Sequence, residues 1–174
     1  ALAADDLSLV WVLSDGLCVN GTGLVAGMAE ALGRPVPIAG GLAGDGARFQ
    51  ATWTALGAEA RADQVVAIGC YGKQLRHSIA AVGGWDPFGP RRTVTRSSGS
   101  TLFELDGNPA LDLYERYLGD EAAELPGSAL LYPLQMWPAG PAVAPVVRTV
   151  LAIDREARSM TFAGDIPQGC TVQL

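Results

Sequence analysis

A strand-helix-strand pattern near the N-terminus constrains the fold more than any other feature of the sequence. Residues 7–13 (LSLVWVL) form a near-continuous apolar run, which is typical of a strand buried on both faces. A helix is expected from about Thr22 to Leu32, because apolar residues recur there at helical spacing before Gly33. Residues 35–39 predict a second strand, which ends at a glycine-rich segment.

Beyond the glycine-rich segment the pattern favours strands. Residues 49–56, 64–71 and 74–85 predict consecutive strands of an antiparallel meander, with turns that contain glycine. Residues 92–105 (RTVTRSSGSTLFEL) alternate between apolar and polar side chains on both sides of a Ser-Gly pair, which is the pattern of a hairpin.

The second half of the chain contains one well-marked helix. Asn108 is a candidate cap, Pro109 suits the first helical position, and Gly119 follows the expected end. Residues 120–145 are rich in proline and poorly periodic, so they predict a hinge or an insertion, and residues 147–166 predict another hairpin. The expected fold class is α+β or mixed α/β: a strand-helix-strand unit, an antiparallel meander with hairpins, and two principal helices.

Composition argues for a folded chain that does not bind polyanions. The 174 residues are 49% hydrophobic and 17% charged, which disfavours disorder. A net charge of −6 repels phosphate backbones and anionic lipid, so neither nucleic acid nor a membrane is an expected partner. Cys18, Cys70 and Cys170 are odd in number and unclustered, which favours a reducing, cytoplasmic setting.

The sequence contains no recognisable catalytic, metal or cofactor motif. His77 is the single histidine, which excludes a site with several histidines, and no cysteine pair has zinc-finger spacing. The glycine-rich segment matches neither a P-loop nor a dinucleotide-binding pattern. We therefore expect no catalytic residue, no metal and no cofactor. An enzyme that uses Cys70 or Asp45 is the less favoured alternative.

The candidate site begins at the segment from Gly40 to Gly46, which has four glycines in seven positions. Glycine lets another group approach the backbone closely, so the surplus indicates either a ligand or a neighbouring strand. We expect this segment to turn sharply, and we expect its aspartate to face a concavity that is bordered by a tryptophan and by the strand at residues 93–96. The candidate ligand-binding residues are Gly40, Gly41, Asp45, Trp85, Arg96 and Asp106. The alternatives are core packing for Trp85 and backbone hydrogen bonding in a turn for Asp106.

Three segments resemble the FIST family. SDGLCVNGTGLVAGMAEALGRPVPIAGGLAGDGARFQATW is similar to the second half of the FIST N region. VGGWDPFGPRRTVTRSSGSTLFELDGNPALDLYERYLG resembles the passage from FIST N into FIST C, and MTFAGDIPQGCTVQL is similar to a later FIST C strand pair. The resemblance implies a FIST N-like segment over residues 1–103, truncated at its start. It also implies a FIST C-like segment over residues 104–174, truncated at its end, and the two could pack as one unit.

The resemblance also implies a function. FIST regions are sensory modules of bacterial signalling proteins, joined to chemotaxis, kinase or cyclic-nucleotide outputs, and they occur in eukaryotic F-box proteins. They are thought to bind small ligands, with amino acids among the candidates. Many relatives carry His-Gly-Trp where Gly83-Gly84-Trp85 stands here, so no role that needs this histidine, such as haem ligation, is carried over.

The favoured hypothesis is therefore a sensory module without catalytic activity, whose partners are a small molecule and a signalling output domain or protein. For an amino-acid ligand, Asp45 or Asp106 would accept the ammonium group, Arg96 or the loop backbone would hold the carboxylate, and Trp85 would form a wall. The other alternative is an adaptor lobe that binds a partner through an apolar patch on the segment LYPLQMWP around Trp137.

Overall fold

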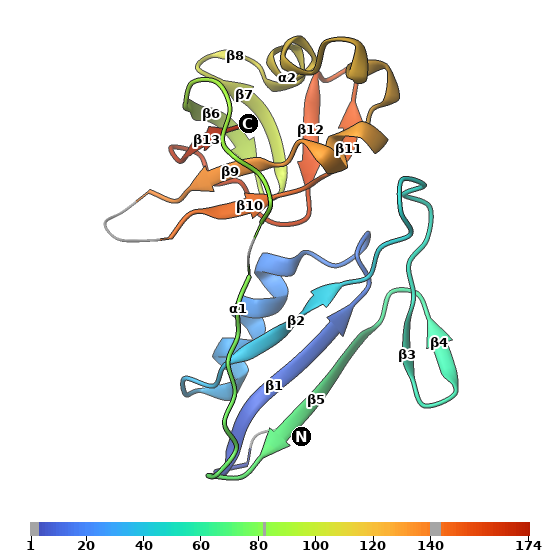
Figure 1. Cartoon of the computed structure of the whole chain (residues 1–174), viewed down its shortest axis with the longest axis vertical. Coiled ribbons are helices and arrows are strands. Elements are labelled where there is room, and N and C mark those ends of the chain that lie inside the picture. Colours follow the sequence, from blue (N-terminus) through green and yellow to red (C-terminus); the bar gives the residue numbers. More distant parts are fainter. Residues whose placement is uncertain (1–3, 82, 140–143) are drawn as a thin grey trace. The chain divides into compact units, whose positions relative to one another are not determined.

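The computed structural model describes residues 4–81, 83–139 and 144–174, and the chain divides into two compact units (Figure 1). The first unit comprises Ala1–Gly46 and Gln50–Val82, and the second comprises Ala47–Phe49 and Gly83–Leu174. Both units combine strands with one α-helix, so the chain has a mixed α+β fold, as the sequence predicts.

The first unit is built on a three-stranded sheet with the strand order β2-β1-β5. The central strand β1 runs parallel to β2 and antiparallel to β5. The helix α1 connects β1 to β2, which confirms the predicted strand-helix-strand unit. A separate hairpin, β3-β4, lies between β2 and β5 in the sequence. The elements are β1 (Leu7–Ser14), α1 (Gly21–Leu32), β2 (Ile38–Leu42), β3 (Thr54–Leu56), β4 (Glu59–Arg61) and β5 (Val65–Tyr71).

Local capping explains where α1 begins and ends. The Asn20 side chain accepts a hydrogen bond from the backbone N–H of Gly23, which satisfies one of the free donors at the start of the helix. Gly33 ends the helix in the left-handed conformation, with a φ of 63°, and its N–H donates to the carbonyls of Ala29 and Glu30. Both ends therefore follow from short-range sequence signals.

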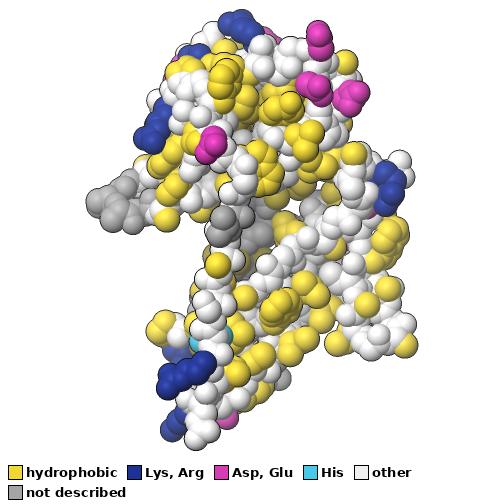
Figure 2. All heavy atoms as spheres, in the orientation of Figure 1, with side chains coloured by type: hydrophobic (Ala, Val, Ile, Leu, Met, Phe, Trp, Pro, Cys, Tyr) yellow, Lys and Arg dark blue, Asp and Glu magenta, His cyan; other side chains and the backbone are white. Residues whose placement is uncertain are grey.

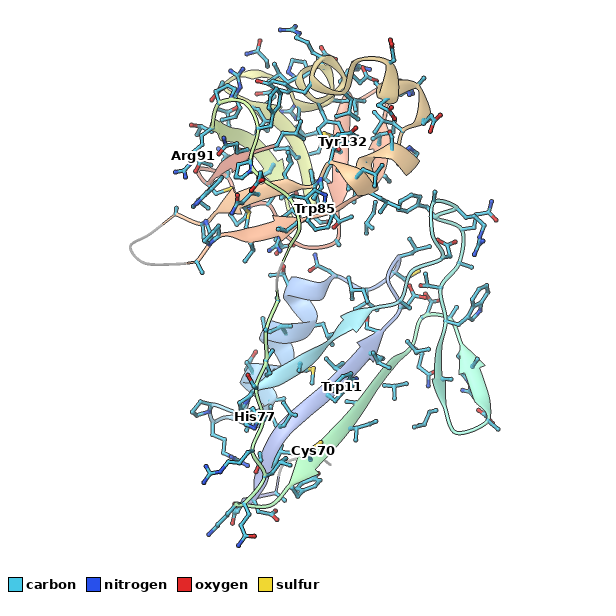
Figure 3. The ribbon with its side chains drawn as sticks, in the orientation of Figure 1. Trp11, Cys70, His77, Trp85, Arg91 and Tyr132 are labelled. Atoms are coloured by element: carbon cyan, nitrogen blue, oxygen red, sulfur yellow. The ribbon has the colours of Figure 1, made fainter. Side chains whose placement is uncertain are left out.

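The sheet of the first unit has one covered face and one exposed face. Val10 and Val12 of β1 are buried, and Val12 lines a hollow together with residues of α1. Trp11 points to the opposite face, where 49% of its surface is exposed, and it lies opposite Ile68 of β5. Hydrophobic side chains gather over β1 and β5 on this face (Figures 2 and 3). The prediction that the first strand is buried on both faces was therefore wrong.

The predicted meander is wrong as a whole, although its strand at residues 64–71 is present as β5. Residue 82 of the strand predicted at residues 74–85 lies outside the described residues. Of residues 49–56 only Thr54–Leu56 form a strand, and they pair with β4. Residues 74–81 form no strand, and His77 within them is exposed (Figure 3). An alternating pattern allows a segment to form a strand, but the segment also needs a neighbouring strand whose backbone groups are free to pair. The strand β5, which precedes residues 74–81, pairs with β1.

The second unit is built on an eight-stranded antiparallel sheet with the order β10-β9-β13-β6-β7-β12-β11, in which β8 pairs with β7. The predicted hairpin at residues 92–105 is present as β6 and β7, and the one at residues 147–166 is present as β11 and β12. The strands are β6 (Arg92–Ser98), β7 (Thr101–Leu105), β8 (Asn108–Pro109), β9 (Leu134–Trp137), β10 (Val146–Arg148), β11 (Val150–Asp154), β12 (Ser159–Phe162) and β13 (Thr171–Gln173).

The helix α2 (Ala110–Leu118) closes the hydrophobic core of the second unit. Leu111, Tyr114 and Leu118 recur at helical spacing and are buried against β7 and β12. The Tyr114 hydroxyl donates to the carbonyl of Tyr132 at 2.7 Å, so the polar end of this buried side chain has a partner.

Two expectations for the second unit were wrong. Asn108 pairs with Leu105 in β8, so α2 begins at Ala110 without a side-chain cap. Residues 120–145 were predicted as a hinge or an insertion; the hinge is wrong, because this stretch contains two short 3₁₀ helices, Gly119–Glu124 and Gly127–Leu131, and then the strand β9. Residues 140–143 of this stretch lie outside the described residues. Only four residues of β9 alternate between flanking prolines, which is too short a pattern to recognise in advance.

Candidate functional site

Gly40 and Gly41 lie inside the strand β2, where we had expected a sharp turn. Gly40 lies opposite Val12 of β1, and a Cβ atom built on Gly40 would stand 1.7 Å from the Val12 carbonyl oxygen. A Cβ built on Gly41 would meet no atom within 4 Å. The expected turn at Gly40 was therefore wrong. Glycine is required there because the neighbouring strand comes close, which was one of the two explanations that the sequence left open.

Asp45 holds the loop that follows β2. Its Oδ2 accepts hydrogen bonds from the backbone N–H groups of Gln50 at 2.8 Å and Ala51 at 3.2 Å. An aspartate that binds backbone amides in this way closes a loop. This carboxylate therefore already has two donors without a ligand.

The hollow beside Gly40 and Gly41 is apolar. It has a volume of about 210 Å³ and lies between α1 and β2. None of its lining side chains carries a charge or a strong hydrogen-bonding group. The lining residues are Val12, Gly21, Leu24, Val25, Ile38, Ala39, Gly40, Gly41 and Leu42.

A group of three titratable side chains lies elsewhere in the first unit. Ligand atoms of Asp15, Cys18 and Asp63 lie within 4.8 Å of one another. Asp15 is buried, and its carboxylate accepts hydrogen bonds from the backbone N–H groups of Leu17, Cys18 and Asp63. The Cys18 N–H contributes most to holding the pKa of Asp15 below its ordinary value. The carboxylate therefore serves the turn after β1.

The Cys18 thiol belongs to the same hydrogen-bonded group. Its hydrogen bond to the Asp63 carboxylate raises the pKa of Cys18 to about 11, because the carboxylate favours the neutral thiol over the thiolate. The sequence does not indicate that Asp63 meets Asp15, since 48 residues separate the two.

Cys18 should therefore react slowly with iodoacetamide although its side chain is exposed. At pH 8 only about one thiol in a thousand would be the reactive thiolate. The variant Asp63→Asn removes the negative charge, so the pKa of Cys18 should fall toward the ordinary value of a thiol, and alkylation at pH 8 should accelerate by about tenfold or more. Peptide mass spectrometry across a pH series measures this rate. Equal rates in both proteins would contradict the role given to Asp63, and Asp5→Asn is a control at an exposed carboxylate outside the group.

Arg96 and Asp106 belong to the second unit and have partners there. The Arg96 Nε donates to Glu104 Oε1 at 2.8 Å, and its guanidinium lies 4.6 Å from the centre of the Phe103 ring. Asp106 accepts hydrogen bonds from the Thr93 N–H at 2.8 Å and from Arg92 Nη1 at 3.1 Å. Both side chains therefore hold the β6-β7 hairpin and the turn that follows it.

Trp85 lines the largest hollow of the second unit that we describe. The hollow measures about 370 Å³, and we call it the aromatic hollow. Trp85 is 52% exposed, and its indole Nε1–H donates to the carbonyl of Leu131 at 2.9 Å, which holds the ring in place (Figure 3). The lining residues are Gly84, Trp85, Asp86, Phe88, Tyr117, Leu131, Tyr132, Pro133 and Leu174.

Two further rings of the aromatic hollow, those of Phe88 and Tyr117, are held by contacts within the second unit. The Phe88 and Tyr117 rings meet edge to face, with their centres 6.4 Å apart and their planes at 87°. The Tyr117 hydroxyl accepts a hydrogen bond from Arg92 Nη2 at 3.0 Å. Asp106 therefore reaches the wall of the hollow indirectly, through Arg92 and Tyr117.

A smaller hollow adjoins the aromatic hollow at Trp85. It measures about 150 Å³ and shares four lining residues with its neighbour. Within the part of the chain that the structure describes, only Asp86 of the residues lining the two hollows has a charged side chain. The smaller hollow is lined by Gly83, Trp85, Asp86, Pro87, Pro133, Gln135, Val147 and Leu174.

The six predicted site residues thus fall into two sets. Gly40, Gly41 and Asp45 belong to the first unit, whereas Trp85, Arg96 and Asp106 belong to the second. Sequence reasoning did not single out Asp86, Phe88, Tyr117 or Tyr132. The run WDPFGP was a possible signal, since it places two aromatic residues and an acid within a segment rich in glycine and proline.

Family models identify the chain. The model of the FIST N domain matches residues 1–108, and the model of the FIST C domain matches residues 110–174. The chain belongs to the FIST family. FIST domains are generally sensory domains of signal-transduction proteins. The two matches meet at Pro109, within the second unit, so the FIST N match extends into that unit.

The other comparisons add no relatives. No curated protein and no solved structure matches this FIST chain. Within the described ranges, no helix is long and apolar enough to cross a membrane.

Proposed function

We propose that this FIST chain is a sensory module that binds a small organic ligand in the aromatic hollow. The observation that carries the proposal is a concave site of about 370 Å³ whose aromatic walls are fixed by hydrogen bonds and ring contacts. Ligand sites are usually concave and mostly apolar, with a few polar groups that orient the ligand. The bound state would be passed to a signalling output domain or partner protein.

The proposed ligand is an amino acid or a related amino compound. Its ammonium group would lie near Asp86 and the aromatic faces, and its apolar part would pack against Trp85 and Leu131. Asp45 and Arg96, which the sequence suggested for these roles, are already engaged with backbone amides and with Glu104 respectively. We place the module in the cytoplasm, where its three free cysteines would stay reduced.

Removing the Trp85 ring should weaken ligand binding strongly without unfolding the protein. We expect Trp85→Ala to weaken binding at least tenfold, because the ring forms the wall shared by both hollows. A thermal-shift screen of amino acids and their amines, followed by calorimetric titration of each hit, measures this effect. Trp53→Ala is the matched control, because Trp53 is 58% exposed and belongs to the first unit.

Two results would contradict the proposed function. One is the absence of any stabilisation of the native chain by the whole panel at millimolar concentration. The other is a hit whose affinity is the same in Trp85→Ala as in the native protein, because such a ligand would bind elsewhere.

We further propose that the module binds its ligand without transforming it. Two arrangements support this view: the Asp45 carboxylate holds backbone amides, and Cys70 lies within β5 opposite Leu9. The adaptor alternative keeps only part of its apolar patch, because Leu134 and Met136 of the segment LYPLQMWP are buried in the core, whereas Leu131 is 64% exposed and lines the aromatic hollow.

A further inference from the structure

We infer that the aromatic hollow recognises the positive charge of an organic ammonium group, and that a carboxylate on the same ligand adds no affinity. This inference rests on the proposed function and specifies the ligand class. An amine or a methylated ammonium ion should therefore bind at least as tightly as the amino acid with the same side chain.

Four of the aromatic side chains that the structure describes line the aromatic hollow. Trp85 and Phe88 are 52% and 65% exposed, and both line the aromatic hollow together with Tyr117 and Tyr132. The face of an aromatic ring carries partial negative charge and attracts a cation within about 6 Å of its centre, with tryptophan the strongest. A ligand in the hollow therefore contacts groups that favour positive charge.

The charged side chains near the hollow also favour a cation over an anion. Among the described residues that line the two hollows, Asp86 alone has a charged side chain, and it is acidic. The two arginines nearest in sequence line neither hollow and already have partners: the Arg91 guanidinium lies 3.9 Å from the centre of the Trp137 ring, and Arg92 binds Asp106 and the hydroxyl of the wall residue Tyr117. A ligand carboxylate would therefore meet repulsion from Asp86, whereas an ammonium group would be attracted.

Arg92 could be considered as an anion site, because its buried Nε has no hydrogen-bond partner in the described structure. The cavity that Arg92 lines has a volume of about 20 Å³ and is otherwise lined mainly by core residues. Such a volume is enough for about one water molecule, so a ligand carboxylate does not fit. The charge on Arg92 instead pulls electron density from Tyr117 through their hydrogen bond, which leaves Trp85 and Phe88 as the principal faces for a cation.

Hydrogen bonds and a ring contact hold the Trp85 and Phe88 residues of the hollow in place. The Trp85 indole is held by the Leu131 carbonyl, and Phe88 is held by Tyr117 and by its own N–H, which donates to the carbonyl of Leu174 at 2.5 Å. The rings therefore need little reorganisation when a cation enters, so more of the attraction contributes to affinity.

The test uses three ligands that share one side chain: leucine, its amine 3-methylbutylamine, and its deaminated acid 4-methylpentanoate. Tetramethylammonium serves as a probe that carries charge alone. Each is titrated into the native chain by calorimetry, and the indole N–H signal of Trp85 is followed by NMR. We expect the amine to bind at least tenfold tighter than the acid and no weaker than leucine, with a shift of the Trp85 signal.

Variants separate the charge from the rings. Asp86→Asn should weaken binding of the amine about fivefold, and Trp85→Leu should weaken it at least tenfold while keeping an apolar wall. Asp120→Asn is the matched control, because Asp120 is an exposed acid in the 3₁₀ helix after α2 and does not line the hollow.

The possible failures are distinct. If the acid binds as tightly as the amine, or if leucine binds tenfold tighter than the amine, the hollow is a ligand site but the inference about charge is overturned. If none of the four compounds binds, the inference is overturned for these cations, while the proposed function is judged by the wider panel. An amine affinity that Asp86→Asn and Trp85→Leu both leave unchanged would also overturn it.

Discussion

Gly40→Ala should disrupt the sheet of the first unit, whereas Gly41→Ala should leave it intact. The added methyl group at position 40 would stand 1.7 Å from the carbonyl oxygen of Val12 and 2.7 Å from its carbonyl carbon. Because both atoms belong to the backbone, no side-chain rotation relieves the clash. The strands β1 and β2 must therefore move apart at this position. We expect a loss of about 3 kcal/mol or more in the free energy of unfolding.

The neighbouring glycine is the control for this substitution. The methyl group of Gly41→Ala would meet no atom within 4 Å, so its effect should stay within about 0.5 kcal/mol. Hydrogen exchange measured by mass spectrometry on peptides from β1 and β5 reports on this sheet separately from the second unit. Equal protection of these peptides in the two variants would contradict the strand packing at position 40.

Features set by short-range sequence were predictable. The start of α1 follows from Asn20, whose side chain accepts a hydrogen bond from the N–H of Gly23. Its end follows from Gly33, whose left-handed backbone lets its N–H bind carbonyls of the last turn. The hairpin β6-β7 turns at Gly99, which has a φ of 54°, as the alternating pattern around Ser98-Gly99 indicates. In these places the local preference agrees with the tertiary structure.

Features set by distant partners were not predictable. The surplus of glycines after residue 39 looked like a ligand loop, but at Gly40 it reflects the approach of Val12, which lies far away in the sequence. Residues 74–81 alternate like a strand, yet they form none, because a single sequence does not reveal which strand has a free neighbour.

The candidate site illustrates the same limit. Trp85 was selected from the sequence, but the carbonyl that accepts its hydrogen bond belongs to Leu131, 46 residues later. The ring that contacts Phe88 is that of Tyr117, which lies on α2. The place of Tyr117 at the hollow depends on how that helix packs. The aromatic hollow could therefore be recognised only from the structure.

Phe162→Ala should cause the largest loss of stability in the second unit. Phe162 is 2% exposed in β12, where it lies opposite Val150 and belongs to the hydrophobic core. Removing a fully buried phenyl ring leaves a cavity and should lower the free energy of unfolding by about 3–5 kcal/mol.

Phe88→Ala makes the same chemical change at an exposed position and separates stability from binding. Because Phe88 is 65% exposed and contacts Tyr117 by its edge, its loss should lower the free energy of unfolding by no more than about 1 kcal/mol. The same variant should weaken ligand binding in the aromatic hollow, which Phe88 lines. Urea unfolding followed by circular dichroism measures the stabilities, and calorimetry measures the binding. If Phe88→Ala were as destabilising as Phe162→Ala, Phe88 would be a core residue and the hollow would not be an accessible site.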